Sequence, residues 1–306
     1  MIQFIGSDEF VTARSRNAPV VALESTVLTH GLPRPQNLQL AQDMEHTIRE
    51  EGAVPATIGF LDGQLHVGLN EAELARLANE ENVLKVGPRD YATVIAKKLC
   101  GGTTVAGTML ASKQAGIKVF ATGGIGGVHR DAPFDISADM QALANIPMLV
   151  VCAGAKAILD LLATLEYLET MSVPVVGYGT DEFPAFYSRE SGLDVSVQCD
   201  DPEDIVEFAR AHWSAGLQSA ILVANPVPEE EAISRSEMEP FIEQANREVH
   251  EKGIHGKEVT PFLLQRITEL TEGKSMKANL ALLLNNARLA AQIARSLHAR
   301  ENLKTT

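Results

Sequence analysis

Lys156 directly follows an apolar segment that is an unusual place for a charged side chain. Residues 148–155 read MLVVCAGA, which is typical of a buried strand of a parallel sheet followed by a turn of small residues. Reactive groups in such folds lie at the carboxyl ends of the strands. Desolvation at such a position lowers the pKa of an amine, and an uncharged amine attacks carbonyl carbons. Lys156 is therefore a candidate imine-forming nucleophile; the alternative is a solvated lysine in the first turn of the next helix.

Glu24 holds a similar position at the end of another apolar segment. Residues 19–23 read PVVAL, and the loop that follows, ESTVLTHG over 24–31, is rich in hydroxyl groups. A carboxylate at a strand end within such a loop is suited to proton transfer. The alternative is a solvated carboxylate that precedes the turn at Pro33 and Pro35.

Two glycine-rich turns are candidate anion sites. Residues 122–130 read TGGIGGVHR after a predicted strand, so that backbone N–H groups can approach an anion closely and His129 or Arg130 can add charge. Residues 101–106, GGTTVA, open a predicted helix in the same manner, and Lys85 ends a short apolar strand. Tight chain geometry alone is the alternative explanation of these glycines, and the pattern is not that of a dinucleotide-binding turn.

Asp135 and Asp139 lie four residues apart within FDISAD, residues 134–139. If this segment is helical, the two carboxylates share a face and can hold a hard divalent cation with water molecules, or one of them can bind a sugar hydroxyl. The alternative is a helix N-terminus, where aspartate is favoured by capping and by the helix dipole. The eight histidines show no HExxH or paired spacing, so no zinc site is predicted.

Positioning these residues requires short strands that alternate with amphipathic helices. Asp62-Gly63 marks a hairpin, and Asn70 with Glu73 is a capping signature for the helix that follows. The alternation predicts a three-layer α/β/α fold with a mostly parallel central sheet and a helical C-terminal portion, in one domain over residues 1–306. The predicted strands are 19–23, 57–61, 65–69, 83–86, 117–121, 148–152, 173–176 and 220–223; the predicted helices begin at 36 and cover 90–99, 104–114, 158–168 and much of the chain from 236, including 278–295.

Composition excludes several classes of function. The formal net charge of −14 argues against a protein that binds nucleic acid or anionic membrane surfaces. The three cysteines are widely separated and odd in number, which indicates no disulfide framework and a reducing compartment. The N-terminal residues do not resemble a signal peptide, and no apolar run approaches the ~20 residues that span a bilayer. We expect a cytoplasmic protein.

Taken together, the motifs make the chain resemble the pseudouridine-5′-phosphate glycosidase family, also called pseudouridylate synthase or the indigoidine synthase A-like family. The resemblance covers nearly the whole chain. The matching segments include LESTVLTHGLPRPQN from Leu23, GGTTVAGTM from Gly101, FATGGIGGVHR from Phe120, FDISAD from Phe134, VVCAGAKAILD from Val150, GYGTDEFPAFYSR from Gly177 and GKEVTPFLLQR from Gly256.

The resemblance implies a reversible reaction in which pseudouridine 5′-phosphate and water give uracil and ribose 5-phosphate. The bond that breaks joins two carbon atoms, so the leaving group needs an electron sink. Lys156 matches the lysine that joins C1′ of the ring-opened ribose as an imine, and Glu24 matches the acid/base that helps to open the ring.

The resemblance also implies the rest of the site and a homotrimer. Asp135 matches the family's metal-associated aspartate, usually with Mn²⁺. Residues that match its substrate-binding positions are Lys85, Val105, Ser137, Ala138 and Asp139, with His129 and one of the two asparagines Asn285 and Asn286, taken as Asn286, in the same pocket.

Two departures from the family pattern lie near the expected phosphate and metal region. Gly87-Pro88 stands where the family often has Ser-Arg, and the loop 129–134 is about two residues shorter. Two alternative functions stay open at this point. One is another imine-forming lyase or aldolase that acts on a sugar phosphate, and the other is a noncatalytic nucleotide-binding accessory protein.

Overall fold

A twisted, mostly parallel sheet forms the centre of the protein. The computed structural model describes residues 2–130, 132–254, 256 and 259–302, and within these ranges the main sheet has eleven strands. Their order is β1 (Phe4–Gly6), β4 (Gln64–Val67), β3 (Val54–Leu61), β2 (Val20–Leu23), β7 (Val119–Ala121), β10 (Leu149–Cys152), β14 (Ile221–Ala224), β12 (Val175–Tyr178) and β13 (Val197–Cys199), with β6 (Gly101–Thr103) paired to β3 and β5 (Leu84–Val86) paired to β6.

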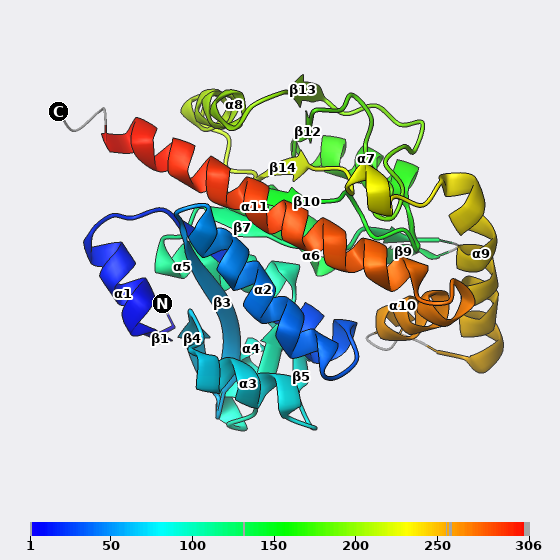
Figure 1. Cartoon of the computed structure of the whole chain (residues 1–306), viewed down its shortest axis with the longest axis horizontal. Helices are drawn as coiled ribbons and strands as arrows, with labels where there is room; N and C mark the ends of the chain where they lie inside the picture. Colours follow the sequence, from blue (N-terminus) through cyan, green and yellow to red (C-terminus); the bar gives the residue numbers. More distant parts are fainter. Residues whose placement is uncertain (1, 131, 255, 257–258, 303–306) are drawn as a thin grey trace.

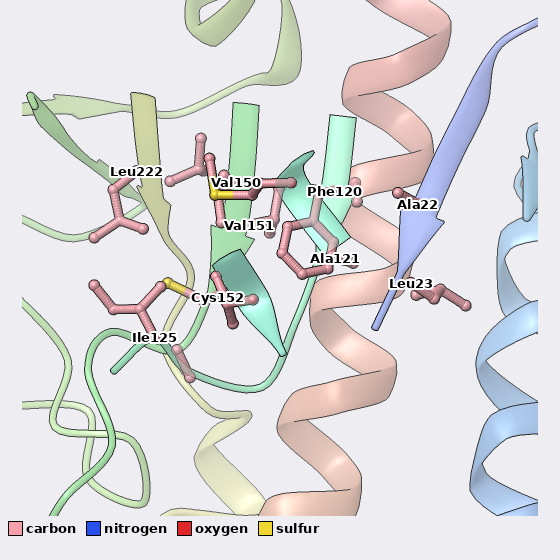
Figure 2. Close-up of a cluster of buried hydrophobic side chains, with 14 of the residues drawn as sticks. Ala22, Leu23, Phe120, Ala121, Ile125, Val150, Val151, Cys152 and Leu222 are labelled. Atoms are coloured by element: carbon pink, nitrogen blue, oxygen red, sulfur yellow. The ribbon is translucent and has the colours of Figure 1, made fainter. Parts of the chain in front are cut away.

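The neighbouring strands β2, β7, β10 and β14 run parallel and carry the deepest part of the core. Ala22 pairs with Phe120, and Phe120 with Val150. These residues and Leu222 on β14 are fully buried, and Figure 2 shows the side chains of these strands packed together. Apolar side chains on both faces explain why these segments read as continuous hydrophobic runs. Because the strands are parallel, their carboxyl ends meet at one edge of the sheet.

Helices cover both faces of the sheet, which confirms the predicted α/β/α architecture. The helix α11 (Lys274–Asn302) crosses one face beside α2 (Gln36–Glu50), and α8 (Pro202–Ser214) also contacts α11 (Figure 1). The helices α5 (Val105–Ala115) and α6 (Ala138–Asn145) contact each other behind the sheet. The remaining helices are α1 (Asp8–Ser15), α3 (Glu71–Asn79), α4 (Tyr91–Ala96), α7 (Leu161–Thr170), α9 (Arg235–Lys252) and α10 (Val259–Leu270).

A small antiparallel sheet lies beyond the carboxyl end of β7 and β10. It consists of β11 (Leu159–Asp160), β8 (Val128–His129) and β9 (Ala132–Ile136), in that order. A π-helical turn, η1 (Val27–Gly31), follows β2 in the loop that Glu24 opens. Such turns are frequent at functional sites.

Most predicted elements are present, but the helices α1 and α8 were not predicted, and several boundaries differ. The hairpin at Asp62-Gly63 and the capping box of Asn70 with Glu73 are confirmed. The predicted helix 90–99 is shorter, because a 3₁₀ turn over Pro88–Asp90 precedes α4, which ends at Ala96. The helix predicted from 158 begins at Leu161. Strands β6 and β13 were not predicted, since each has three residues and no clear alternation.

The proposed common helical face of Asp135 and Asp139 is wrong. Asp135 lies on β9, whereas Asp139 lies in the first turn of α6, and Ser137 between them is the N-cap. The capping interpretation of this segment is the correct one. No helix in the described ranges is both long enough and apolar enough to cross a membrane.

Candidate active site

A cavity of about 720 Å³ opens at the carboxyl edge of the parallel sheet. The ends of β2 and β10, the small sheet and the first turns of α5 and α6 all contribute to its wall. This convergence is expected for open α/β sheets, in which ligands bind beyond the carboxyl ends of the strands. The predicted site residues that line the cavity are Glu24, Lys85, Val105, His129, Asp135, Ser137, Ala138, Asp139 and Lys156.

Lys156 reaches the cavity through a tight turn after β10. Gly154 has φ of +84°, and a Cβ at this position would lie 2.0 Å from the carbonyl oxygen of Pro184. Only glycine is free of this clash. The Lys156 amide donates to the carbonyl oxygen of Ile125 at 3.1 Å, which ties the turn to the glycine-rich segment after β7. The side chain is half-buried, and the next helix begins only at Leu161, so Lys156 is not a solvated residue of a helical first turn.

Glu24 is half-buried at the end of β2, and the hydroxyl of Thr122 donates a hydrogen bond to its carboxylate. Burial raises the pKa of Glu24 above its ordinary value of 4.5. The positive charge of Lys156 and the hydrogen bond from Thr122 act in the opposite direction, while the charge of Asp139 adds to the increase. The shift favours the protonated form of this carboxyl group more than in a free glutamate, in the cavity that Lys156 also lines.

Buried hydroxyl groups fix the loop that begins at Glu24. The hydroxyl of Ser25 donates to the carbonyl oxygen of Ile58 at 2.6 Å and accepts from the amide of Thr103 at 2.9 Å. Thr26, which lines the cavity, donates to the carbonyl oxygen of Gly102 at 3.1 Å. These bonds hold the loop against β3 and β6 and so limit the freedom of the Glu24 side chain.

Asp139 joins two backbone segments that flank the cavity. One carboxylate oxygen accepts from the amide of Ala106 at 2.9 Å, and the other accepts from the amide of Gly126 at 2.8 Å. A Cβ on Gly126 would lie 2.3 Å from the Ser137 hydroxyl and 2.8 Å from Asp139, so this glycine permits the close approach. The amides of Ala106 and Gly126, which the sequence suggested for an external anion, are satisfied by a carboxylate of the protein itself.

Three positive side chains besides Lys156 line the same cavity. Lys85, at the middle of β5, is joined there by Arg89 and Lys113, which the sequence analysis did not select. Arg89 and Lys113 are exposed, and a charged residue on an exposed helix or turn carries no local sign of its function. Against a chain charge of −14, this local cluster favours a phosphorylated ligand.

His129 and Asp135 face the cavity from the small sheet. Burial lowers the pKa of His129 below 6.5, the charges of Lys156 and Lys85 lower it further, and Asp135 opposes them. His129 is therefore neutral at pH 7. Asp135 is exposed, and the described residues contain no group of three or more His, Cys, Asp or Glu side chains placed to hold a metal. This arrangement does not fit zinc or a cation held by protein ligands alone, but one carboxylate suits a hard cation that keeps most of its water.

The structure places Asn286 outside the cavity. It is fully buried in α11, where its amide nitrogen donates to the carbonyl oxygen of Thr122 at 2.8 Å and its oxygen accepts from Asn225 at 3.0 Å. Asn285 donates to the carbonyl oxygen of Pro226 at 3.2 Å and does not line the cavity either. Asn286 instead supports the residue that holds Glu24. Thr122 was missed, although a hydroxyl directly after β7 gives the same strand-end signal as Glu24 itself.

Arg130 does not supply charge to the cavity, contrary to one possibility that the sequence suggested. It follows His129 but lines a separate hollow on the other side of β8. Its guanidinium group binds backbone carbonyl groups and a glutamate there.

Fold and site together define an α/β enzyme. Its cavity holds an amine and a carboxyl group from the ends of parallel strands, and positive side chains that suit a phosphate group. A family model described as "Indigoidine synthase A like protein" matches residues 9–296. The chain therefore belongs to the indigoidine synthase A-like family.

Relatives and solved structures agree with this assignment over nearly the full chain. Two relatives named pseudouridine-5′-phosphate glycosidase come from Caldanaerobacter subterraneus, with 53% identity over 95% of this chain and 96% of the relative, and from Paracoccus denitrificans, with 55% identity over 95% and 97%. An indigoidine synthase A-like protein from Thermotoga maritima has a TM-score of 0.89 and 38% identity, and covers 97% of each chain. The prealnumycin C-glycosynthase AlnA, solved with ribulose 5-phosphate, has a TM-score of 0.90 and 38% identity over 99% of this chain and 100% of AlnA.

Proposed function

We propose that this protein is a pseudouridine-5′-phosphate glycosidase, which reversibly cleaves the C–C glycosidic bond of pseudouridine 5′-phosphate to give uracil and ribose 5-phosphate. The observation that carries the proposal is the meeting of Lys156 and Glu24 in one cavity, each placed by the carboxyl end of a parallel strand. The names of the relatives and the sugar phosphate in the AlnA structure support the same substrate class.

The chemistry uses the amine as an electron sink. Glu24 donates a proton to the ring oxygen O4′ as the C1′–O4′ bond breaks, and the Lys156 nitrogen forms a bond to C1′ and loses a proton. The nitrogen lone pair then forms the C1′=N bond while the C1′–C5 bond breaks and C5 of uracil takes up a proton. Water hydrolyses the imine, which releases ribose 5-phosphate and restores the free amine.

The remaining residues bind and orient the substrate. Lys85, together with Arg89 and Lys113, is placed to bind the 5′-phosphate, because positive side chains form strong charge-assisted hydrogen bonds to phosphate oxygens. Neutral His129 is able to accept or donate a hydrogen bond to the sugar without adding charge. Other proposed contact residues are Val105, Ser137, Ala138 and Asp139.

A divalent cation, Mn²⁺ by family resemblance, is part of the proposal. Asp135 would hold it together with water and the substrate's phosphate, which is the usual mode of a hard cation with few protein ligands. Such an ion neutralises phosphate charge when it is bound. Removal of divalent ions with EDTA should then raise KM more than it lowers kcat, and Asp135→Asn should remove the dependence on added Mn²⁺.

We further propose a homotrimer in the cytoplasm, on the strength of the family resemblance and of the cysteine pattern. Sedimentation velocity at several protein concentrations tests the assembly. A single monomeric species at all concentrations would contradict it.

The decisive experiment is chromatography of the products formed from pseudouridine 5′-phosphate. We expect the wild-type protein to release uracil and ribose 5-phosphate, and Lys156→Ala and Glu24→Gln to lose at least about 10³-fold in kcat. Borohydride with ribose 5-phosphate should leave an adduct on Lys156 that mass spectrometry locates. An adduct without uracil release would indicate a different imine-forming lyase or aldolase. Full biological activity of Lys156→Ala would indicate a noncatalytic protein.

A further inference from the structure

The turn that carries Lys156 lies between two cavities. Lys156 lines the candidate active site, while Ala157 lines a second cavity of about 650 Å³ on the opposite side of the turn, and Leu159 lines both. The last residue of β8 and the residue after it divide in the same way, because His129 lines the active-site cavity and Arg130 lines the second one.

Arg130 binds the backbone of this turn from the side of the second cavity. Its Nη2 donates to the carbonyl oxygen of Ala157 and its Nε to that of Leu159, both at 3.2 Å. These carbonyl groups lie one and three residues after Lys156. A guanidinium group offers several donors in a fixed planar arrangement, so that one side chain fixes the relative position of two carbonyl groups.

A carboxylate on α9 fixes the guanidinium in turn. Nη1 of Arg130 donates to Oε1 of Glu239 at 2.5 Å, with side-chain exposures of 26% and 33%. Charge-assisted bonds of this kind are stronger than neutral ones. Leu159 also pairs with His129 across the antiparallel strands β11 and β8, so the segment that Arg130 binds is connected to β8 as well. One side chain thus links His129, the Lys156 turn and α9.

We propose that Arg130 is a positioning residue, held by Glu239, that fixes the turn carrying Lys156 so that the amine meets C1′ of the sugar. This inference deepens the proposed function and rests on it for the identity of the sugar. Arg130 does not touch the substrate, since it lies on the far side of the turn. Its effect appears in the rate of imine formation and not in substrate binding.

The test combines truncation with chemical rescue. Arg130→Ala should lower kcat for uracil release about 100-fold, the cost of a misplacement of about 1 Å in a reacting group, and leave KM within about threefold. The second cavity is open beside the truncated side chain, so guanidinium chloride, at concentrations far below those that unfold proteins, should restore part of the lost kcat. Arg130→Lys should restore little, because an ammonium group cannot hold both carbonyl groups.

A matched control separates positioning from general stability. Arg266 on α10 is 28% exposed and binds Glu248, which also lies on α9. Arg266→Ala should lower the melting temperature without changing kcat, and guanidinium should not increase its activity. The proposal is overturned if Arg130→Ala has a kcat within threefold of the wild type. It is also overturned if the loss of kcat is unchanged by guanidinium and is explained by the fraction of unfolded protein.

Two further measurements keep the outcome decisive. If Arg130→Ala does not fold, Glu239→Ala replaces it, with an expected kcat about 10-fold below the wild type and unchanged KM. If the wild-type protein releases no uracil, the proposed function fails but the positioning role is still tested by borohydride labelling of Lys156 with glycolaldehyde, a small aldehyde. Labelling of Lys156 at the wild-type rate in the Arg130 and Glu239 variants would refute the positioning role.

Discussion

The hydroxyl of Thr122 donates a hydrogen bond to the carboxylate of Glu24, and the two residues directly follow the paired parallel strands β7 and β2. A carboxylate that accepts a hydrogen bond is stabilised in its charged form, whereas burial stabilises the neutral form. Both effects act on Glu24, with burial the larger. Thr122 therefore restrains the increase in the pKa of the proton donor.

Removal of this hydroxyl should change the pH profile of the reaction in one direction. In Thr122→Ala the hydrogen bond that lowers the pKa of Glu24 is lost, so the pKa increases further. The limb of the pH profile of kcat/KM that depends on Glu24 is the one that is absent in Glu24→Gln. We expect this limb to move to higher pH in Thr122→Ala. Thr122→Ser keeps the hydroxyl and should leave the limb in place. A shift to lower pH in the alanine variant would refute this assignment.

Glu24→Gln should stabilise the protein at high pH while it abolishes activity. Because the folded-state pKa of Glu24 is raised above 4.5, the contribution of Glu24 to the stability of the wild type is greatest below that pH and is lost as pH rises through the folded pKa. Glutamine does not ionise, so the melting temperature of Glu24→Gln should exceed that of the wild type by an amount that grows from pH 4.5 to pH 8. A difference of about 1 kcal/mol in the free energy of unfolding corresponds to an increase on the order of 2–4 °C.

Glu248→Gln is the control with the opposite sign. Hydrogen bonds from Arg266 hold the pKa of Glu248 below 4.5. Its contribution to stability is therefore present above pH 4.5 and decreases as pH falls through the folded pKa. The glutamine variant should be the less stable protein at pH 8 and approach the wild type in acid. Differences in melting temperature that do not change with pH, in either variant, would contradict the linkage.

The sequence predicted the strand-end residues well because their signal is local. A continuous apolar run identifies a buried strand, and the first polar residue after it, such as Glu24 or Lys156, must lie at the carboxyl edge of the sheet. The α/β/α architecture follows from the same alternation of periodic segments. Family resemblance added Val105, Ser137 and Ala138, which also line the cavity.

The residues that the sequence misassigned act through contacts between distant segments. Asn286 meets Thr122 across 164 residues of sequence, and Arg130 meets Glu239 across 109. No periodicity or spacing indicates which way such a side chain points, because the direction is set by the packing of α11 against the sheet and of α9 against α10. The short strand β9, which carries Asp135, has no hydrophobic alternation strong enough to distinguish it from a helix start.

Asn286 should be essential for stability and for the geometry of Glu24, although it does not touch the cavity. Asn286→Ala leaves the carbonyl of Thr122 and the amide of Asn225 without these partners in a fully buried environment. Each unsatisfied buried group costs about 1–3 kcal/mol, which urea denaturation measures. We also expect a decrease in kcat of about 10-fold with little change in KM.

The neighbouring Asn285 is the control for this variant. It is half-buried, and within the described part of the chain its side chain makes one hydrogen bond, to the carbonyl oxygen of Pro226. Asn285→Ala should cost only about 0.5–1.5 kcal/mol and leave kcat unchanged. Equal losses of stability and activity in the two variants would mean that α11 supports the site only as a whole.

Asp139→Asn should destabilise the ligand-free protein, because the aspartate holds two backbone segments together. Its two oxygens accept from Ala106 and Gly126, but an asparagine side chain has one oxygen, so one amide must lose its acceptor. We expect a loss of about 1–3 kcal/mol in the free energy of unfolding, together with an increase in KM. Asp135→Asn, an exposed carboxylate in the same cavity, should change stability by less than about 0.5 kcal/mol. If Asp139 acted only as a ligand of the substrate, both variants would unfold like the wild type in the absence of substrate. Other contacts would then have to hold α5 and the glycine-rich turn together.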